Sequence, residues 1–140
     1  MSQPIVLVEE SHALPLVHLT IAGGTGGIED PAGKEGLTRF VSRLMRRTGG
    51  GMTPQVLDTR IDSLGGSLGA DVSHSASAFH GTVISRSLEA FVDVLTDVIA
   101  KPGFDLEEHD RLRGEREAEL VESRDNDRSL ARLWFRNKLF

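Results

Sequence analysis

The sequence predicts an α+β fold, an antiparallel sheet with its helices packed on one face. Three observations lead to this prediction. Short segments near the N-terminus and in the middle of the chain alternate apolar and polar residues, which is the period of strands. Other segments repeat apolar residues every three to four positions, as amphipathic helices do. Glycine- and proline-containing pairs separate these segments. The order of the segments is two strands, two helices, a hairpin and two helices, which suits a sheet covered by helices on one face.

The N-terminal region is predicted to contain two strands and a loop. Residues 5–8 form one apolar strand, a turn follows at 11–14, and residues 16–22 form the second strand. The glycine-rich segment 23–27 lacks the ending and spacing of a phosphate-binding loop, and the carboxylates at 29–30 would repel phosphate. We therefore interpret this segment as a flexible connection to the next helix.

The segment 36–46 is predicted to form an amphipathic helix. Its apolar residues have the spacing i, i+3, i+4, i+7 and i+8 of a buried stripe. They are Leu37, Phe40, Val41, Leu44 and Met45. The residues of the opposite face are Arg39, Ser42, Arg43 and Arg46. Taken alone, this face is best explained as a solvated basic surface, because charged helix faces usually serve solubility.

The middle of the chain is predicted to form a helix and a hairpin. Thr53 and Pro54 have the residue types of an N-cap and a first helical position, a loop from Arg47 to Met52 precedes them, and Gly65–Gly66 end the helix. The segments 67–73 and 78–84 then form the two strands of the hairpin. The residues that the helix is expected to bury are Val56, Leu57, Ile61 and Leu64.

The C-terminal half is predicted to be mostly helical. Ser87 begins a helix that Pro102–Gly103 end, and Asp105 begins a longer, charged helix that reaches about Arg124. A further apolar stripe begins at Leu130. The buried face of the first of these helices is expected to hold Leu88, Phe91, Val92, Leu95, Val98 and Ile99, and the last stripe Leu130, Leu133 and Trp134.

Composition fits a single domain that spans 1–140. The chain has 140 residues, 39% of them hydrophobic, which is enough for one core. Its net charge of −5 argues against a nucleic-acid surface. No apolar run approaches the roughly 18 residues of a membrane-spanning helix, and no signal peptide is evident. The absence of cysteine leaves the redox compartment open, so a bacterial cytoplasm and a periplasm are both compatible.

The remaining histidines and serines form no recognisable catalytic or metal-binding motif. The five histidines include no pair at i and i+4, and His18 and His80 are expected to be ordinary strand histidines. No Gly-x-Ser-x-Gly sequence marks an activated serine. The helix at 36–46 is therefore the segment that most needs a functional interpretation.

The segment Gly36–Met45 resembles the zinc-binding helix of the pitrilysin/insulinase-type (M16) metallopeptidases. At the matching positions the family carries the inverted zincin motif His-x-x-Glu-His, whose histidines bind Zn²⁺ and whose glutamate is the general base. Here Arg39 and Arg43 stand at the histidine positions and Ser42 at the glutamate position. Arginine has no lone pair to donate and stays protonated. The resemblance therefore implies a zinc-site scaffold with no catalytic residue, no metal ligand set and no cofactor.

The resemblance extends to the family's third zinc ligand, a glutamate on a later helix. Glu119, which lies 76 residues after Arg43, stands at its position, and the residues 119–127 resemble the family's segment there. Some relatives carry another acidic residue two turns earlier, where this chain has Leu112. The degenerate zinc-site positions are thus Arg39, Ser42, Arg43 and Glu119. We expect the Glu119 carboxylate to form an ion pair with the arginines in place of the metal.

The hairpin also resembles a functional segment of the family. In active relatives a strand with the pattern Asn-Ala-x-Thr follows a glycine pair, and its edge pairs with extended substrate. The matching residues here are Gly69, Ala70, Asp71 and Val72, so the alanine is kept while the asparagine and threonine are lost. Backbone pairing needs no particular side chain, so this is a candidate peptide-binding edge strand. The alternative is an ordinary edge strand.

The resemblance implies a function without catalysis. The chain looks like a truncated N-terminal M16 domain that ends in mid-domain at Phe140. We expect it to belong to a silent subunit that partners a zinc-bearing homologue and helps to enclose or hold a peptide substrate. The alternatives are a structural or assembly subunit that handles no peptide, and the silent half of a chain whose other part is an active zinc peptidase.

Overall fold

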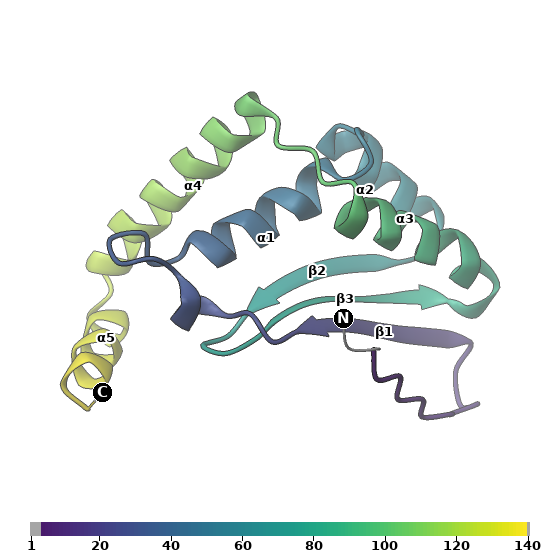
Figure 1. The fold of residues 1–140 in the computed structure, drawn as a ribbon, viewed down its shortest axis with the longest axis horizontal. Coiled ribbons are helices and arrows are strands. Elements are labelled where there is room, and N and C mark those ends of the chain that lie inside the picture. The colour runs from purple at the N-terminus through teal and green to yellow at the C-terminus, as the bar shows by residue number, and fades with distance from the viewer. Residues whose placement is uncertain (1–3, 140) are drawn as a thin grey trace.

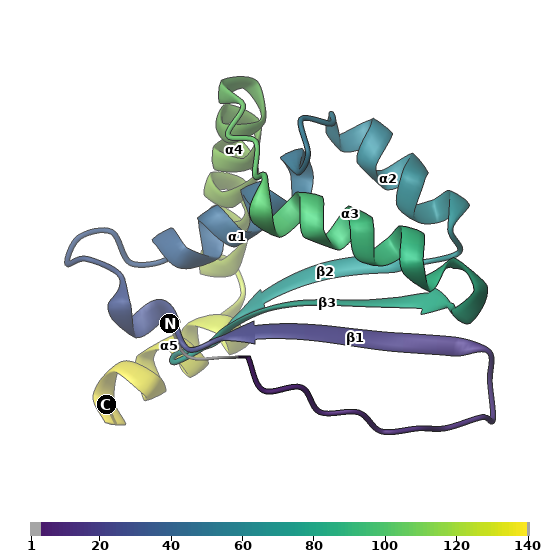
Figure 2. The same cartoon turned by 45° about the vertical axis from the view of Figure 1, so that its right-hand side comes forward.

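A three-stranded antiparallel sheet forms the base of the described structure, with helices on one of its faces (Figures 1 and 2). The computed structural model describes residues 4–139, without the side chains of residues 129, 133, 136 and 137. The strands are β1 (Leu16–Gly23), β2 (Ser67–Val72) and β3 (Ser77–Ile84), in the order β1-β3-β2. The predicted α+β class is confirmed.

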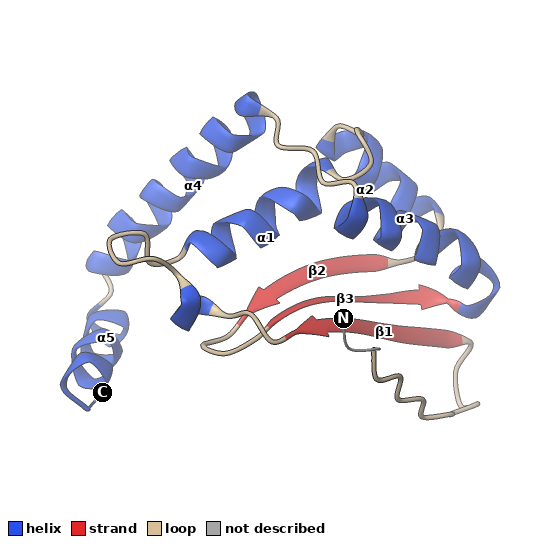
Figure 3. Cartoon of the chain, in the orientation of Figure 1, coloured by secondary structure: helices blue, strands red, loops and turns tan. Residues whose placement is uncertain are grey.

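The described residues form five α-helices, which Figure 3 separates from the strands by colour. They are α1 (Leu37–Thr48), α2 (Pro54–Ser63), α3 (Leu88–Ala100), α4 (Leu106–Arg124) and α5 (Asp127–Leu139), with short 3-10 turns at Gly27–Glu29 and Ser85–Ser87. Helices α1 and α3 lie over the sheet, α2 packs against α1 and β2, and α4 packs against α1. None of the described helices has the length and hydropathy needed to cross a membrane.

The hydrophobic core lies between the sheet and helices α2 and α3. Its largest fully buried side chain is Phe91, and Gly81 lies so close to the Phe91 ring that a Cβ at Gly81 would approach it to 2.5 Å. The other buried members of the core are Leu57, Ile61, Leu68, Phe79, Val83, Val94, Leu95 and Val98. Helix periodicity predicted five of these nine positions: Leu57, Ile61, Phe91, Leu95 and Val98.

In helices α1, α2 and α3, three residues that the sequence predicts to be buried are substantially exposed. Leu37, Val56 and Val92 have exposed fractions of 42%, 54% and 40%. The buried neighbours Leu57 and Phe91 on the same helices as Val56 and Val92 are fully covered. The stripe was therefore identified correctly, but its width was overestimated.

The loop before α1 is packed rather than flexible, which corrects the prediction for this glycine-rich segment. Ser73 closes the hairpin turn by donating its N–H to the Ala76 carbonyl at 2.8 Å, and Gly27 donates its N–H to the Ser73 carbonyl at 3.0 Å. A Cβ at Gly26 would lie 2.5 Å from the carbonyl oxygen of His74 and from the nitrogen of Ala76. The close approach of the loop to the hairpin turn therefore requires glycine at this position.

Both ends of α1 are fixed by residues outside the helix. The Asp30 carboxylate accepts the N–H groups of Gly36 at 2.7 Å and Thr38 at 2.9 Å. The hydrogen bond from the Thr38 hydroxyl, followed by that from its N–H, lowers the pKa of Asp30. At the other end, Gly49 packs so closely on α3 that a Cβ would lie 2.4 Å from the Cα of Val98.

Several predicted boundaries need correction. The residues Ile5–Val8 form no strand and pair with none of the described strands, and the exposed fractions of their side chains run from 77% to 90%. Helix α1 continues to Thr48, although the sequence predicted a loop from Arg47. Ser87 stands at the N-cap of α3 without a side-chain capping bond.

The apolar stripe predicted near the C-terminus lies on α5. Leu130 is half-buried, whereas Trp134 is 65% exposed, because little of the described structure packs against this helix. The side chain of Leu133 and all of Phe140 lie outside the described residues.

Candidate functional site

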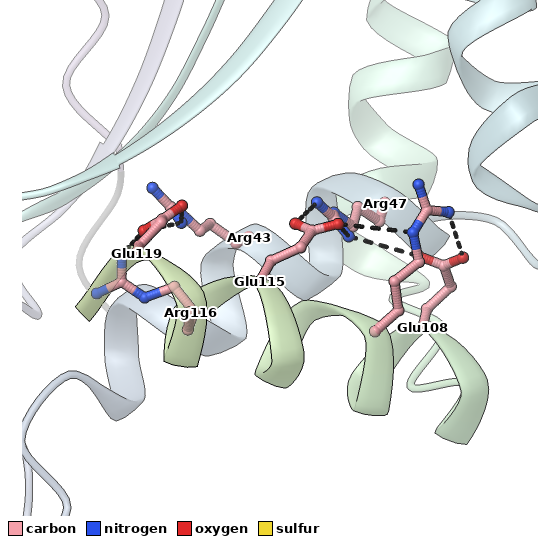
Figure 4. Close-up of polar contacts among 7 residues, drawn as sticks. Arg43, Arg47, Glu108, Glu115, Arg116 and Glu119 are labelled. Atoms are coloured by element: carbon pink, nitrogen blue, oxygen red, sulfur yellow. Dashed lines mark hydrogen bonds and ion pairs between the residues drawn. The ribbon is translucent and has the colours of Figure 1, made fainter. Parts of the chain in front are cut away.

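Helices α1 and α4 lie side by side, and arginines of α1 face glutamates of α4 (Figure 4). Arg43 Nη1 lies 3.2 Å from Glu119 Oε1 and 3.4 Å from Oε2. These two residues come from helices far apart in the sequence, and only the fold brings them together. The ion pair expected at Glu119 is confirmed for Arg43.

Glu119 has a second cationic partner. Arg116, one turn earlier on α4, also donates to its carboxylate. Desolvation by itself would raise the pKa of Glu119, but the hydrogen bond and charge of Arg43 and the charge of Arg116 outweigh it and lower this pKa. The Glu119 side chain is 47% exposed, so this is a partly solvated ion pair. At neutral pH the carboxylate is ionised and its charge is shared between two guanidinium groups.

A second arginine of α1, one turn further on, meets α4 in the same way. Arg47 Nη1 lies 3.2 Å from Glu115 Oε1, and Nη2 donates to Oε2, so the contact has two points. This hydrogen bond raises the pKa of Arg47 and lowers that of Glu115. Arg47 Nη1 also lies 3.6 Å from Glu108 Oε2. We call the set Arg43, Arg47, Glu108, Glu115 and Glu119 the charged seam.

The other two α1 residues predicted at zinc-site positions, Arg39 and Ser42, form their hydrogen bonds elsewhere than with Glu119. Arg39 donates from Nη2 to the carbonyl of Val72 at 2.9 Å. Ser42, expected on the solvated face, is only 6% exposed and donates its hydroxyl to the Thr38 carbonyl at 2.9 Å. The solvated-face interpretation was therefore wrong at this position. Leu112, where some relatives carry an acidic residue, is 1% exposed and packs as an apolar side chain.

A shallow pocket of about 430 Å³ opens beside the charged seam. Its lining residues are Arg43, Arg46, Arg47, Asp58, Ala70, Glu115 and Glu119. Three guanidinium groups and three carboxylates therefore surround it, and each arginine is paired with an acid, including Arg46 with Asp58 at 2.9 Å. The charges balance within the pocket, so its walls present neither an anion-binding nor a cation-binding surface.

The donors at this site do not suit a zinc ion. Zinc in proteins takes three or four lone-pair donors from His, Cys, Asp or Glu in tetrahedral geometry. In the described part of the chain, no three residues of these types lie close enough together to share a metal. The Glu119 carboxylate is surrounded by protonated guanidinium groups instead. The chemistry that this arrangement supports is charge pairing between two helices.

The second half of the charged seam was missed from the sequence alone. Glu115 and Glu119 are four residues apart on α4, and Arg43 and Arg47 are four residues apart on α1. Residues four apart lie on the same face of a helix. The matching spacing of the two arginines and the two glutamates could therefore have predicted that α1 and α4 pack with these opposite charges in contact. Glu108 gave no such signal, because it lies in the first turn of α4, where an acidic residue is expected at any helix start.

Comparison with known proteins shows the family of this chain. Residues 5–138 match the family described as Insulinase (Peptidase family M16). The chain belongs to the M16 peptidase family. It is similar to the beta subunit of the mitochondrial-processing peptidase of Dictyostelium discoideum, with 28% identity over 82 residues. That match covers 58% of this chain but only 18% of the relative, so the chain spans a small part of that protein's length.

Two solved structures have the same fold. A peptidase M16 inactive domain from Pseudomonas fluorescens matches 89% of this chain and 31% of its own, with a TM-score of 0.82 and 17% identity. Pitrilysin matches 83% of this chain and 12% of its own, with a TM-score of 0.70 and 26% identity. The M16 chain described here therefore has the pitrilysin-like domain fold, and it lacks the His-x-x-Glu-His sequence at the corresponding helix.

Proposed function

We propose that this M16 domain is non-catalytic and that an ion pair occupies the degenerate zinc-site positions. The observation that carries the proposal is the contact of Arg43 with Glu119 at 3.2 Å, between α1 and α4. An arginine cannot act as a zinc ligand, whereas its guanidinium matches a carboxylate in charge and shape. The single retained acid therefore connects two helices in place of binding a metal.

Catalysis would also need a general base, and the domain offers none at the matching position. Ser42 is buried and donates its hydroxyl to a backbone carbonyl of its own helix. A base must reach the water or group from which it takes a proton. On this basis we propose no peptidase activity for residues 1–140, which we take as a single N-terminal M16 domain.

The role that remains is that of a silent subunit beside a zinc-bearing homologue, helping to enclose a peptide substrate. The supporting observations are the similarity to a protein named as a peptidase subunit and the fold shared with an M16 inactive domain. A structural or assembly role without peptide, and a silent half of a larger active chain, are the competing proposals. Co-purification from the source cell separates them, because only the first requires a zinc-bearing M16 homologue as a separate chain in the complex.

The zinc proposal is tested by elemental analysis and by rebuilding the motif. We expect no stoichiometric zinc in the wild type. The double change Arg39→His with Arg43→His puts two imidazoles one turn apart on the helix that contacts Glu119, and we expect zinc binding to return. Adding Ser42→Glu restores the written motif, and we expect little or no peptide cleavage from it, because catalysis also needs a substrate held in place.

The control is the double variant with Glu119→Gln added, which should lose the regained zinc. One tightly held zinc per wild-type chain, lost on Glu119→Gln, would overturn the proposal. Efficient cleavage by the triple variant would show that loss of the motif alone accounts for the lack of peptidase activity. Failure of a folded double variant to bind zinc would mean that α1 and α4 do not present these positions to one ion.

A further inference from the structure

The two edges of the sheet differ in what contacts them. Strand β2 forms one edge and pairs on its other side with β3, with Ser67 opposite Thr82 and Val72 opposite Ser77. The bond from the Ser73 N–H to the Ala76 carbonyl fixes the alternation of the ladder. In an antiparallel ladder, the backbone groups of successive residues point alternately toward the partner strand and away from it. Since Ser73 bonds toward β3, the odd-numbered residues of β2 also bond to β3. The even-numbered residues of β2 therefore present their N–H and C=O groups at the free edge.

Arginines of α1 donate to two of the outward carbonyls. Arg46 donates from Nε to the carbonyl of Leu68 at 2.8 Å, and Arg39 donates from Nη2 to the carbonyl of Val72 at 2.9 Å. Both acceptors are even-numbered residues of β2, in agreement with the alternation. The two carbonyls at the ends of the free edge are therefore already hydrogen-bonded to cationic donors, which form stronger bonds than neutral ones.

The geometry of helix and strand explains why both contacts form. Arg39 and Arg46 are seven residues apart, which is about 10 Å along a helix. Leu68 and Val72 are four residues apart, which is about 13 Å along a strand. Helix α1 packs against β2, so two long side chains two turns apart reach two carbonyls on the same edge. The Asp58 carboxylate of α2, 2.9 Å from Arg46 Nη2, also holds the Arg46 guanidinium in place.

We propose that Arg39 and Arg46 close the free edge of β2 to strand addition, so that neither an extended peptide nor a second copy of the chain pairs there. A peptide adding to β2 would donate its N–H groups to the carbonyls of Leu68 and Val72. Both carbonyls already accept a bond from an arginine, so among the outward carbonyls of β2 only that of Ala70 has no bond from a described side chain. Charged side chains at a sheet edge are a known protection against such pairing.

The opposite edge carries no such protection. Among the described residues, no side chain donates to or accepts from a backbone group of β1, although its length of eight residues exceeds the six of β2. The closure is thus specific to the edge beside the charged seam. It concerns the binding of any extended chain, and it does not depend on the proposal of a zinc-bearing partner subunit.

The test measures peptide binding to the opened edge. The variant carries Arg39→Ala and Arg46→Ala, and the control carries Arg43→Ala, which breaks the Glu119 ion pair without touching β2. The probe is a fluorescein-labelled peptide of alternating threonine and valine with a lysine at each end, followed by fluorescence anisotropy. We expect the double variant to bind it about tenfold more tightly than the wild type or the control, since two edge positions become free.

A further substitution locates the binding. Ala70→Pro removes the central of the three outward N–H groups of β2 without breaking a bond to β3, so added to the double variant it should abolish the gain. Concentration-dependent dimers of the double variant that disappear with Ala70→Pro would support the proposal equally. An equal affinity of a folded double variant and wild type, or a gain that survives Ala70→Pro, would overturn it. If the double variant fails to fold, the exposed Arg39→Ala alone should give a smaller gain, and no gain would count against the proposal.

Discussion

Helices α3 and α4 both pack against α1, and they do so by different means. Helix α3 buries Phe91, Val94, Leu95 and Val98, each at most 2% exposed. Helix α4 buries one apolar side chain, Leu112, and otherwise faces α1 through the charged seam. The helix that builds the core is therefore fixed by apolar area, whereas the helix that carries Glu119 is fixed by one leucine and a row of ion pairs.

The difference places the candidate site on the weaker of the two contacts. Burying apolar surface gives stability that changes little with salt or pH, while partly exposed ion pairs are screened and each contributes little. The α1–α4 contact is thus expected to open before the core does. Three experiments test this ranking, from the largest expected effect to the smallest.

Phe91→Ala should give the largest loss of stability. The ring is fully buried between α3 and the sheet, and truncation leaves a cavity that its close neighbours cannot fill. We expect the free energy of unfolding to fall by about 3–5 kcal/mol, measured by urea denaturation. The matched control is Val92→Ala on the same helix, which is 40% exposed and should cost about 0.5 kcal/mol or less. Similar losses for both variants would mean that α3 does not define the core.

Leu112→Ala should have a smaller effect that is confined to α4. Its side chain is 1% exposed, but no other apolar side chain among the described residues of α4 is buried. We expect a loss near the lower end of the range for Leu→Ala, about 2 kcal/mol, and faster amide hydrogen exchange in α4 than in α3. The control is Leu120→Ala, 56% exposed on the same helix, which should change neither quantity. Equal acceleration of exchange in α3 would show that the two contacts are one cooperative unit.

Acidification should have the smallest and most diagnostic effect. The pKa values of Glu115 and Glu119 are both lowered in the folded state. Their contribution to stability is therefore complete above the unfolded-state pKa and is lost as pH falls through it toward the folded-state value. Both side chains are more than a third exposed, so we expect each pair to contribute about 0–1 kcal/mol.

The measurement is the melting temperature from pH 7 to pH 3, for the wild type and for Glu115→Gln with Glu119→Gln. The wild type should lose more stability over this range, and added salt should reduce the difference between the two proteins at neutral pH. Asp30, whose pKa is also lowered, contributes in the same direction and serves as a shared background because both proteins keep it. Parallel curves would show that the charged seam adds nothing to the α1–α4 contact.

Local patterns in the sequence were enough to predict most of the fold. Thr53 caps α2 by accepting the Val56 N–H, and Gly65 ends it with φ of 64°. The alternation of residues 67–84 gave the hairpin, and the stripe around Phe91 gave the core face of α3. These features depend on contacts between residues close in sequence, which periodicity and capping chemistry describe well.

The sequence alone determined that Arg39, Ser42 and Arg43, which we propose to stand at zinc-site positions, cannot form a zinc ligand set, because arginine and serine lack the required chemistry in any fold. Tertiary structure decided what those residues do instead. Of the three positions on α1, one reaches Glu119, one is buried, and one donates to the edge of β2. The same holds for the apolar run Ile5–Val8, whose residues favour a strand but find none to pair with. A residue's chemistry is fixed by its side chain, but its partners are fixed by packing between segments that lie far apart in the chain.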